Sequence, residues 1–280
     1  MSASPRPIHG VDHYENFPVA SFLCPPALRP AIMAIYWFAR TADDLADEGD
    51  AAPVARLADL ATYRADLTAC AECKPTSNSW ASVFTPLRSM IEQHKLPVNL
   101  LADLLSAFEQ DVTKTRYASK AELLDYCRRS ANPVGRLLLH LYKVSDAESL
   151  AQSDCICTAL QLINFWQDLA VDIPRGRIYL PADGFAPHGV DEAQLQRLEV
   201  NPATTMLVAT NVAWAKSLMQ RGAPLVKKVP GRAGWELRLV VQGGLRIAEK
   251  IEQLGFATLR QRPKLNTWDG VVMLWRCVWM

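Results

Sequence analysis

Three features are missing from this 280-residue sequence, and each absence excludes a class of protein. No run approaches the roughly 20 apolar residues of a membrane-spanning helix, so we expect no spanning segment. The net charge is only +1, which argues against a protein that binds nucleic acid through a strongly basic surface. The first residues do not resemble a secretory signal, and the seven cysteines are an odd number. We therefore expect a cytoplasmic protein in a reducing compartment.

Two weaker signals leave alternatives open. Cys70 and Cys73 have the spacing of a zinc or redox pair, but no second pair accompanies them, so surface cysteines on or after a helix are the favoured interpretation. The segment from Val271 to Met280 is apolar, with two tryptophans and one arginine. This aromatic tail either contacts a membrane surface peripherally or packs onto the body of the protein.

Helical periodicity dominates the sequence, and alternating patterns of period two are missing. In the segment 120–144, Asn132-Pro133 predicts a kink or break, because proline removes a backbone donor and crowds the preceding turn. Neither a repeat nor a linker divides the chain, so we expect one all-α domain over residues 1–280. The predicted helices cover residues 28–47, 53–70, 80–94, 98–111, 120–144, 146–172, 202–226 and 235–254.

The first predicted helix carries an acidic row after an apolar stretch. Asp43 and Asp47 lie one turn apart on the same face, and Arg40 precedes Asp43 by three residues on that face. Residues 31–39 are almost wholly apolar, which predicts a buried helix. We therefore expect the carboxylates at a cavity or its rim, where their repulsion needs a counter-charge.

A second polar row runs through the apolar helix predicted at 146–172. Asn164, Asp168 and Asp172 are spaced i, i+4 and i+8, and Gln161 extends this row by one turn. Carboxylate and amide oxygens without histidine or cysteine are the ligands of a hard cation such as Mg²⁺.

Two such rows predict Mg²⁺ ions that bridge a diphosphate between two helices. Arg40 and the basic run Arg175-Gly-Arg177 can neutralise the remaining phosphate charge. A single pair of aspartates on a helix is more often solvated or salt-bridged. Two rows on apolar helices, in register with an arginine and an asparagine, favour the metal site.

These motifs, in this order and spacing, resemble the squalene/phytoene synthase family of head-to-head prenyl synthases. The resemblance covers most of the chain, to about Gly255. The segments that carry it are Tyr36-x-x-x-Arg40-x-x-Asp43-Asp44-x-x-Asp47-Glu48, Gln161-Leu-x-Asn164-x-x-x-Asp168-x-x-x-Asp172 and Arg175-Gly-Arg177-Ile-Tyr179-Leu-Pro181.

The resemblance implies the α-helical isoprenoid synthase fold with a central cavity, and Mg²⁺ as the cofactor. It implies metal binding by Asp43, Asp47, Asn164, Asp168 and Asp172, with the four aspartates as the catalytic residues. Aromatic faces stabilise a carbocation by ~0.5–2 kcal/mol each, and Phe165 and Trp166 are further candidates for that role. The residues expected to contact substrate are Asn16, Phe17, Tyr36, Arg40, Tyr126, Gln161, Arg177 and Tyr179.

Departures from the family pattern point to a subgroup. The family usually has Tyr-Cys-x-x-Val-Ala-Gly-x-Val-Gly on a kinked helix, and here this stretch reads Tyr126-Cys-Arg128-Arg129-Ser130-Ala-Asn132-Pro133-Val-Gly135. Gln167 stands where an arginine is common, and Gly243-Gly244 stands where a cavity tyrosine is common. With the stretch His13-Tyr-Glu-Asn-Phe-Pro-Val-Ala, the chain looks like the bacterial hydroxysqualene synthases of hopanoid pathways.

That resemblance implies Mg²⁺-assisted ionisation of presqualene diphosphate, rearrangement of the cation and capture by water, without a nicotinamide. The products would be hydroxysqualene and diphosphate, and polar groups near Asn132 are candidates for positioning the water. The nearest alternative is condensation of two prenyl diphosphates to presqualene diphosphate, squalene or phytoene. Gln167 weighs against it, because two diphosphates demand more basic residues.

A further alternative is a non-catalytic relative that acts as an assembly protein, which would be expected to lose its metal ligands. The expected partner is a long-chain prenyl diphosphate. Peripheral membrane contact and neighbouring enzymes of the same pathway remain open.

Overall fold

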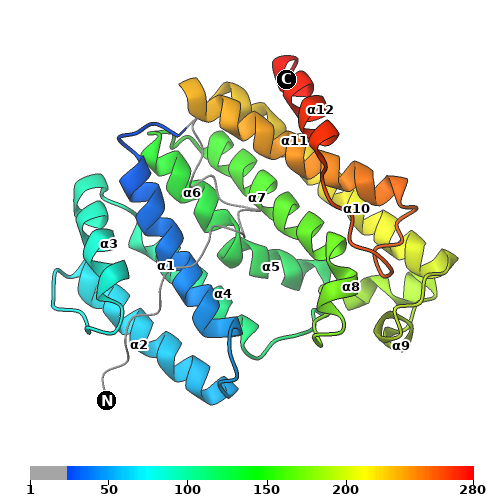
Figure 1. Cartoon of the computed structure of the whole chain (residues 1–280), viewed down its shortest axis with the longest axis horizontal. Coiled ribbons are helices and arrows are strands. Elements are labelled where there is room, and N and C mark those ends of the chain that lie inside the picture. The colour runs from blue at the N-terminus through cyan, green and yellow to red at the C-terminus, as the bar shows by residue number, and fades with distance from the viewer. Residues whose placement is uncertain (1–23) are drawn as a thin grey trace.

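The structure is a computed structural model that describes residues 24–280, and it is built from helices (Figure 1). Within these residues, β-structure is limited to one isolated bridge between Arg116 and Ile178. The predicted all-α fold class is confirmed. The α-helices are α1 (Arg29–Asp47), α2 (Pro53–Ala71), α3 (Ala81–His94), α4 (Val98–Asp111), α5 (Lys120–Ser130), α6 (Asn132–Leu141), α7 (Ala147–Gln167), α8 (Leu169–Asp172), α9 (Glu192–Gln196), α10 (Pro202–Gly222), α11 (Gly231–Gln253) and α12 (Thr267–Val278), with short 3₁₀ helices η1 (Ala182–Gly184), η2 (Ala186–His188) and η3 (Ala223–Lys227).

Local side-chain caps determine where several helices begin. At α10, the Asn201 side chain accepts a hydrogen bond from the Thr204 backbone N–H at 2.9 Å, and Pro202 lies in the first turn. At α5, the Ser119 hydroxyl accepts from the Glu122 backbone N–H at 3.2 Å. Such caps satisfy backbone donors that have no partner within the helix, so these helix starts are local properties of the sequence.

The helix predicted at 120–144 is two helices, with the break where the proline predicts it. Ala131 separates α5 from α6 with a φ of −118°, and Pro133 lies in the first turn of α6. Asn132 is buried, and its side-chain oxygen accepts a hydrogen bond from the Thr158 hydroxyl at 2.9 Å. The break is therefore tied to α7 by a buried polar contact.

Two hydrophobic cores lie on either side of the molecule. The first joins α1 to α4 around Phe38, Tyr63 and Phe84, and the Tyr63 hydroxyl donates to the Phe38 carbonyl at 3.0 Å. The second surrounds α7, where Trp166 is fully buried. Burying each such side chain contributes about 1.5–3 kcal/mol, so both cores hold their helices firmly in place.

Helix α7 is the central element, and α5, α6, α10 and α11 all pack against it. Small residues allow the close approach. A Cβ at Gly222 of α10 would lie 2.6 Å from the Gln152 carbonyl oxygen of α7. A Cβ at Gly244 of α11 would lie 2.9 Å from Leu160 Cδ2. Gly244 therefore brings α11 against the helix that carries the second polar row.

The second polar row does not lie on one continuous helix. The sequence predicts a helix from 146 to 172, but α7 ends at Gln167 and the short α8 begins at Leu169. Asp168, between them, has φ −101° and ψ 14°. The backbone bonds from Asp168 to Asn164 and from Asp172 to Asp168 persist at 3.0 and 2.9 Å. The row is thus bent at Asp168, not interrupted.

Helix α12 was not among the predicted helices. Its N-terminus carries a capping box, in which Asn266 accepts from the Asp269 backbone N–H at 3.0 Å and donates its own N–H to Asp269 at 2.7 Å. Figure 1 shows α12 lying beside α11 at the edge of the molecule. An Asn-x-x-Asp capping pattern was the sequence signal for this helix.

The prediction of surface cysteines holds for one of the two. Cys73 is exposed, but Cys70 is buried against the Phe84 carbonyl. Helical periodicity explains the difference, because Cys70 follows the buried Leu67 by three residues on the inner face of α2.

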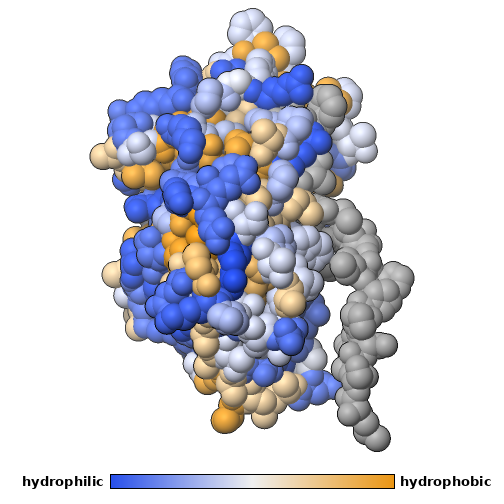
Figure 2. All heavy atoms as spheres, turned by 90° about the vertical axis from the view of Figure 1, so that its left-hand side faces the viewer, coloured by the Kyte–Doolittle hydropathy of each residue, from blue (hydrophilic) through white to orange (hydrophobic). Residues whose placement is uncertain are grey.

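The surface is mostly hydrophilic on the side that carries α1 to α3. Figure 2 shows this face, with hydrophobic side chains visible between hydrophilic ones near its middle. Among residues 24–280, no helix combines the length and apolarity that crossing a bilayer requires.

Candidate active site

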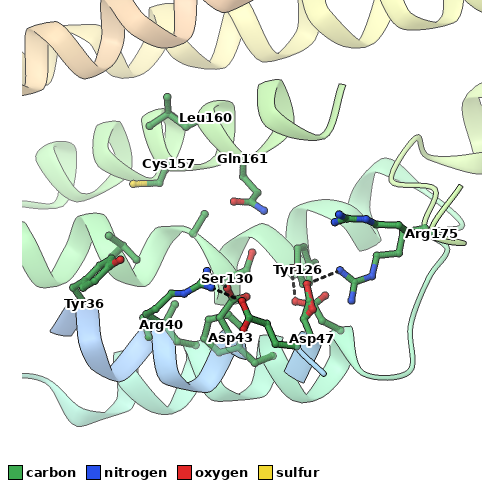
Figure 3. Close-up of a pocket in the computed structure, with 18 residues that line it drawn as sticks. Tyr36, Arg40, Asp43, Asp47, Tyr126, Ser130, Cys157, Leu160, Gln161 and Arg175 are labelled. Carbon is green, nitrogen blue, oxygen red and sulfur yellow. Dashed lines mark hydrogen bonds and ion pairs between the residues drawn. The ribbon is translucent and has the colours of Figure 1, made fainter. Parts of the chain in front are cut away.

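A cavity of about 900 Å³ lies between α1, α4, α5, α6, α7 and the loop after α8. Its ends differ in character. Figure 3 shows Tyr36 and Cys157 at one end and Asp47 with Arg175 near the other. At 1.5 Å per residue, Tyr36 and Asp47 are about 16 Å apart along α1, so the cavity accommodates a long chain. The lining residues are Tyr36, Ala39, Arg40, Asp43, Asp47, Glu48, Leu104, Phe108, Asp111, Tyr126, Ser130, Ala131, Val134, Cys157, Leu160, Gln161, Arg175 and Arg177.

Helix α1 supplies the acidic wall, as the spacing of its aspartates predicts. Asp43 and Asp47 both line the cavity, and so does Arg40. One guanidinium nitrogen of Arg40 lies 3.2 Å from the Asp43 carboxylate. The other lies 2.6 Å from Asp44 and 2.7 Å from Glu48. A single arginine therefore serves three carboxylates, which leaves this wall with a negative excess.

The pKa values in this wall are raised mainly by burial, and the neighbouring carboxylates add to the increase. Burial raises the pKa of Asp43, against the opposing charge of Arg40, and the neighbouring Asp47 adds to the increase. Burial also raises the pKa of Asp44 to about 6. A carboxylate with a raised pKa is costly to keep ionised, and an added cation removes that cost. The wall is therefore electrostatically suited to bind cations.

The loop after α8 places two arginines at the same end. Gly176 adopts a φ of +82°, a conformation that glycine accepts readily, and this turn separates Arg175 from Arg177. The backbone N–H groups of both arginines donate to the Asp172 carbonyl, at 3.1 and 3.0 Å. The Arg177 guanidinium then reaches Asp47 at 3.2 Å. This end of the cavity thus combines carboxylates with arginines.

Asp111, at the end of α4, is a cavity residue that the sequence analysis missed. It accepts a hydrogen bond from the Tyr126 hydroxyl at 2.7 Å through one oxygen. Its other oxygen is buried without a hydrogen-bond partner among the described residues. Burial raises the pKa of Asp111 to about 7, against the lowering effect of Tyr126. Asp111 is the last residue of α4 and has no second aspartate one turn before it, so the spacing rule did not reveal it.

Tyr126 lines the cavity, whereas Tyr179 lies behind it. The Tyr179 ring stacks on Phe165 with 3.7 Å between centroids and on Tyr117 with 5.8 Å. Tyr117 in turn contacts Tyr126 at 5.5 Å. Tyr179 is thus positioned to support the cavity wall through this aromatic stack. Tyr179, which the sequence predicts as a substrate contact, is therefore not one of the residues that line the cavity.

Of the second polar row, only Gln161 lines the cavity. Figure 3 shows its side chain pointing from α7 toward the acidic row of α1. Asn164, Asp168 and Asp172 are not among the lining residues. Asp168 forms an ion pair with Arg262, from the segment before α12. Burial and the charge of Asp168 raise the pKa of Asp172 to about 6.

Gln167 explains how Arg262 reaches this position. Its side chain is buried and donates a hydrogen bond to the Pro263 carbonyl at 2.8 Å. The residue next to Pro263 is Arg262, whose guanidinium contacts Asp168. The sequence interpretation counted Gln167 as the loss of one basic group. Arg262, 94 residues after Asp168, supplies a basic group to the same row.

The remaining predicted site residues, Asn16 and Phe17, lie outside the described residues.

The donor chemistry of the residues at the cavity fits a hard metal ion. No three histidine, cysteine, aspartate or glutamate side chains within 24–280 converge on one point. The donors near the cavity are carboxylates, the ligand type that Mg²⁺ prefers, and Mg²⁺ usually takes only one or two of them together with substrate phosphate. The partnerless oxygen of Asp111 adds a buried acceptor on the same wall.

The lining of the cavity also includes a serine at the end of α5. The Ser130 hydroxyl is buried, has no hydrogen-bond partner among the described residues, and belongs to the lining of the cavity. Ala131 and Val134 follow it in the wall. Asn132, the residue expected near a captured water, is instead held by Thr158 and is not a lining residue.

Comparisons with known proteins agree on one family. The family model described as squalene/phytoene synthase matches residues 11–269. A hydroxysqualene synthase from Zymomonas mobilis is 40% identical over 212 residues, which cover 75% of this chain and 69% of that protein. A hydroxysqualene synthase from Sinorhizobium fredii is 34% identical over 253 residues, which cover 90% of this chain and 83% of that protein.

A solved structure has a similar fold. The crystal structure of squalene synthase HpnC from Alicyclobacillus acidocaldarius superposes with a TM-score of 0.80 at 34% identity, and the match covers 87% of this chain and 90% of that chain.

Proposed function

Because the chain belongs to the squalene/phytoene synthase family of prenyl synthases, we propose that it ionises presqualene diphosphate and captures the rearranged cation with water. The carbon–oxygen bond to diphosphate breaks, and its electron pair leaves with the diphosphate. Water then forms the new carbon–oxygen bond and loses a proton. The products are hydroxysqualene and diphosphate, and no reductant is consumed.

The observation that carries the proposal is the polarity of the cavity. One end gathers Asp43, Asp47, Arg40, Arg175 and Arg177, whereas the other is lined mainly by apolar side chains. A diphosphate with a long hydrocarbon chain has the same division between a charged head and an apolar body. The cavity is therefore complementary to a prenyl diphosphate along its length.

We propose Mg²⁺ as the cofactor, which Asp43 and Asp47 of α1 would hold together with Asn164, Asp168 and Asp172 of α7 and α8. Bound Mg²⁺ would stabilise the negative charge that develops on the leaving diphosphate. The ion pairs with Arg40, Arg177 and Arg262 orient these carboxylates before substrate binds.

The protein's own groups have separate tasks around that centre. Arg40, Arg175 and Arg177 bind phosphate oxygens by charge-assisted hydrogen bonds. Gln161, which points toward α1, can donate its amide N–H to the same group. The Tyr126 ring lies at the cavity wall with its hydroxyl held by Asp111, and we propose that the ring contacts the reacting carbons of a bound substrate. Such a face stabilises a nearby carbocation by ~0.5–2 kcal/mol.

Ser130 is the proposed position of the captured water. Its buried hydroxyl has no hydrogen-bond partner among the described residues, lines the cavity, and can exchange a hydrogen bond with a water bound there. The residue also stands where the family pattern has valine. Water capture is thus supported by a polar atom that a hydrocarbon-forming enzyme does not need.

The first experiment supplies purified protein with presqualene diphosphate or, separately, farnesyl diphosphate, with and without Mg²⁺ and without a nicotinamide. The expected result is hydroxysqualene from presqualene diphosphate only, and only with Mg²⁺. Asp43→Asn should reduce kcat/KM by about 10³-fold, since several kcal/mol of charge stabilisation is lost. Asp59→Asn, an exposed aspartate on α2, is the matched control. Turnover of farnesyl diphosphate would instead assign the condensation reaction.

Ser130→Val tests the captured water. The expected result is about a tenfold smaller share of hydroxysqualene among the products, because one hydrogen bond of about 1 kcal/mol no longer localises the water. Consumption of substrate should change less than the product ratio. Ser130→Thr keeps the hydroxyl and should retain hydroxysqualene. An unchanged product ratio in Ser130→Val would remove Ser130 from this role.

A further inference from the structure

Helix α12 exposes one continuous apolar face. Its residues are spaced so that they fall on the same side of the helix, and their exposed fractions range from 51% for Val271 to 75% for Trp279. Single exposed apolar side chains are ordinary, but a contiguous set with three tryptophans marks an interaction surface. The α12 apolar face consists of Trp268, Val271, Leu274, Trp275, Val278 and Trp279.

The opposite face of α12 fixes this orientation. Asp269 is buried, and Arg246 and Lys250 of α11 each hold its carboxylate at 2.7 Å. Arg276 pairs with Glu249 of α11. Arg238 donates to the Cys277 carbonyl at 3.2 Å. Because the polar side of α12 is tied to α11 by ion pairs, the helix cannot roll its apolar face inward without breaking them.

The surface continues onto α11. Trp235 is 46% exposed, and the Arg238 guanidinium lies 4.6 Å from the centre of its ring. The same Arg238 reaches the C-terminal end of α12 through the Cys277 carbonyl. Leu265, just before α12, is also exposed. The exposed tryptophans thus lie on two neighbouring helices.

The charge around this face is positive. Residues 254–280 hold four basic side chains and one acidic one, which gives a net charge of +3. The acidic one, Asp269, is buried in its ion pairs. Arg260 and Lys264, in the segment that leads into α12, are exposed. A helix with exposed tryptophans and aliphatic side chains, preceded by a segment with exposed basic side chains, is complementary to the headgroup region of an anionic bilayer.

From these observations we infer that the α12 apolar face docks on an anionic lipid surface, with the helix lying in the plane of the interface. A helix of 12 residues is about 18 Å long and is too short to span. Docking would give a water-insoluble C30 product a direct route into the bilayer, and this benefit rests on the proposed function. The membrane contact itself does not depend on the proposed function.

The test is co-sedimentation of the purified full chain with vesicles, in the absence of substrate. Vesicles of phosphatidylcholine alone are compared with vesicles that also contain phosphatidylglycerol. The expected result is binding that is stronger to the anionic vesicles and weakened by salt. The triple variant Trp268→Ser, Trp275→Ser, Trp279→Ser should bind the vesicles at least about tenfold more weakly than the wild type, because it removes most of the aromatic area. Arg260→Glu with Lys264→Glu should lose the preference for anionic vesicles.

Val54→Ser with Met206→Ser is the matched control, since both side chains are exposed apolar groups on other helices. This control should bind vesicles like the wild type. Far-UV circular dichroism and turnover of dispersed presqualene diphosphate verify that the tryptophan variant is folded. Wild-type protein that does not sediment with either vesicle type would overturn the inference. So would light scattering showing a wild-type dimer that the triple tryptophan variant converts to monomer, because the face would then join two copies of the chain.

Discussion

The acidic segment of α1, which lines the cavity, and the acidic segment of α7 and α8, which lies next to the cavity loop after α8, carry similar carboxylates but are held in different ways. On α1, an unbroken helix presents Asp43 and Asp47 to the cavity. Asp43 pairs with Arg40 of the same helix, and Asp47 pairs with Arg177 from the loop after α8. On α7 and α8, the backbone bends at Asp168. The Asp168 carboxylate pairs with Arg262, which is 94 residues away in the chain. The carboxylates of the first wall, on α1, are therefore placed by one regular helix, whereas those of the second wall, on α7 and α8, depend on the segment before α12.

This difference has a consequence for metal binding. Each acidic segment has an arginine partner without any metal, so an arriving cation competes with an existing ion pair. On α1 the competition involves Arg40, which three carboxylates share, and Arg177, which pairs with Asp47. The pKa of Asp43 is still raised. On α7 and α8 it involves Arg262, held through Gln167 and Pro263. We therefore expect the second wall, and not the first, to respond to changes in residues 254–266.

The largest expected effect is a loss of activity of the same size in both walls. Asp47→Asn and Asp168→Asn should each lower kcat/KM by about 10³-fold, because each removes a carboxylate from the metal–diphosphate centre. The measurement is product formation over a range of Mg²⁺ concentrations. Activity in Asp168→Asn close to that of the wild type would break the symmetry and leave the α1 wall as the sole metal site.

The next effect separates the walls. Arg262→Gln should lower kcat by about 10²-fold, because the leaving diphosphate loses a positive charge while Asp168 loses its orienting partner. The concentration of Mg²⁺ needed for half-maximal activity should fall, since the metal no longer competes with this arginine. Arg260→Gln, an exposed arginine two residues earlier, is the control. An unchanged Mg²⁺ requirement would show that the ion pair does not compete with the metal.

How far the sequence predicts this site follows from the same difference. The i, i+4 rule placed Arg40, Asp43 and Asp47 correctly on one face, because α1 is a regular helix with local contacts. The all-α class and the break at Asn132-Pro133 were also predicted from local sequence signals. Arg262 could not be found in this way, because its role depends on a tertiary contact between residues 94 positions apart. Asp111 escaped for a similar reason, since only the packing of α4 against α5 brings it to Tyr126.

A smaller effect tests the support of the second wall. Gln167→Leu removes the hydrogen bond to the Pro263 carbonyl and leaves a buried acceptor without its donor, at a cost of about 1–3 kcal/mol. The looser segment should lower kcat by about tenfold, because Arg262 is then held less firmly. The same factor is expected when an α1 residue is also replaced, since the two sites are independent. Denaturant unfolding measures the stability, and a double variant with Arg262→Gln measures the coupling. Strictly additive losses in that double variant would contradict a role for Gln167 in holding Arg262.

The smallest effect concerns the α4 carboxylate that faces the first wall. Burial raises the folded-state pKa of Asp111 to about 7 from an ordinary value of 3.8. A raised pKa means that stability is present below the unfolded-state pKa and is lost as the pH rises between these two values. Asp111→Asn should therefore raise the melting temperature at about pH 8 by a few degrees relative to wild type, and much less at about pH 4. Catalysis should fall in the same variant, because the charge that destabilises the fold is the charge that attracts the cation. An equal gain in melting temperature at both pH values would indicate that the pKa of the Asp111 carboxyl is not raised in the folded protein.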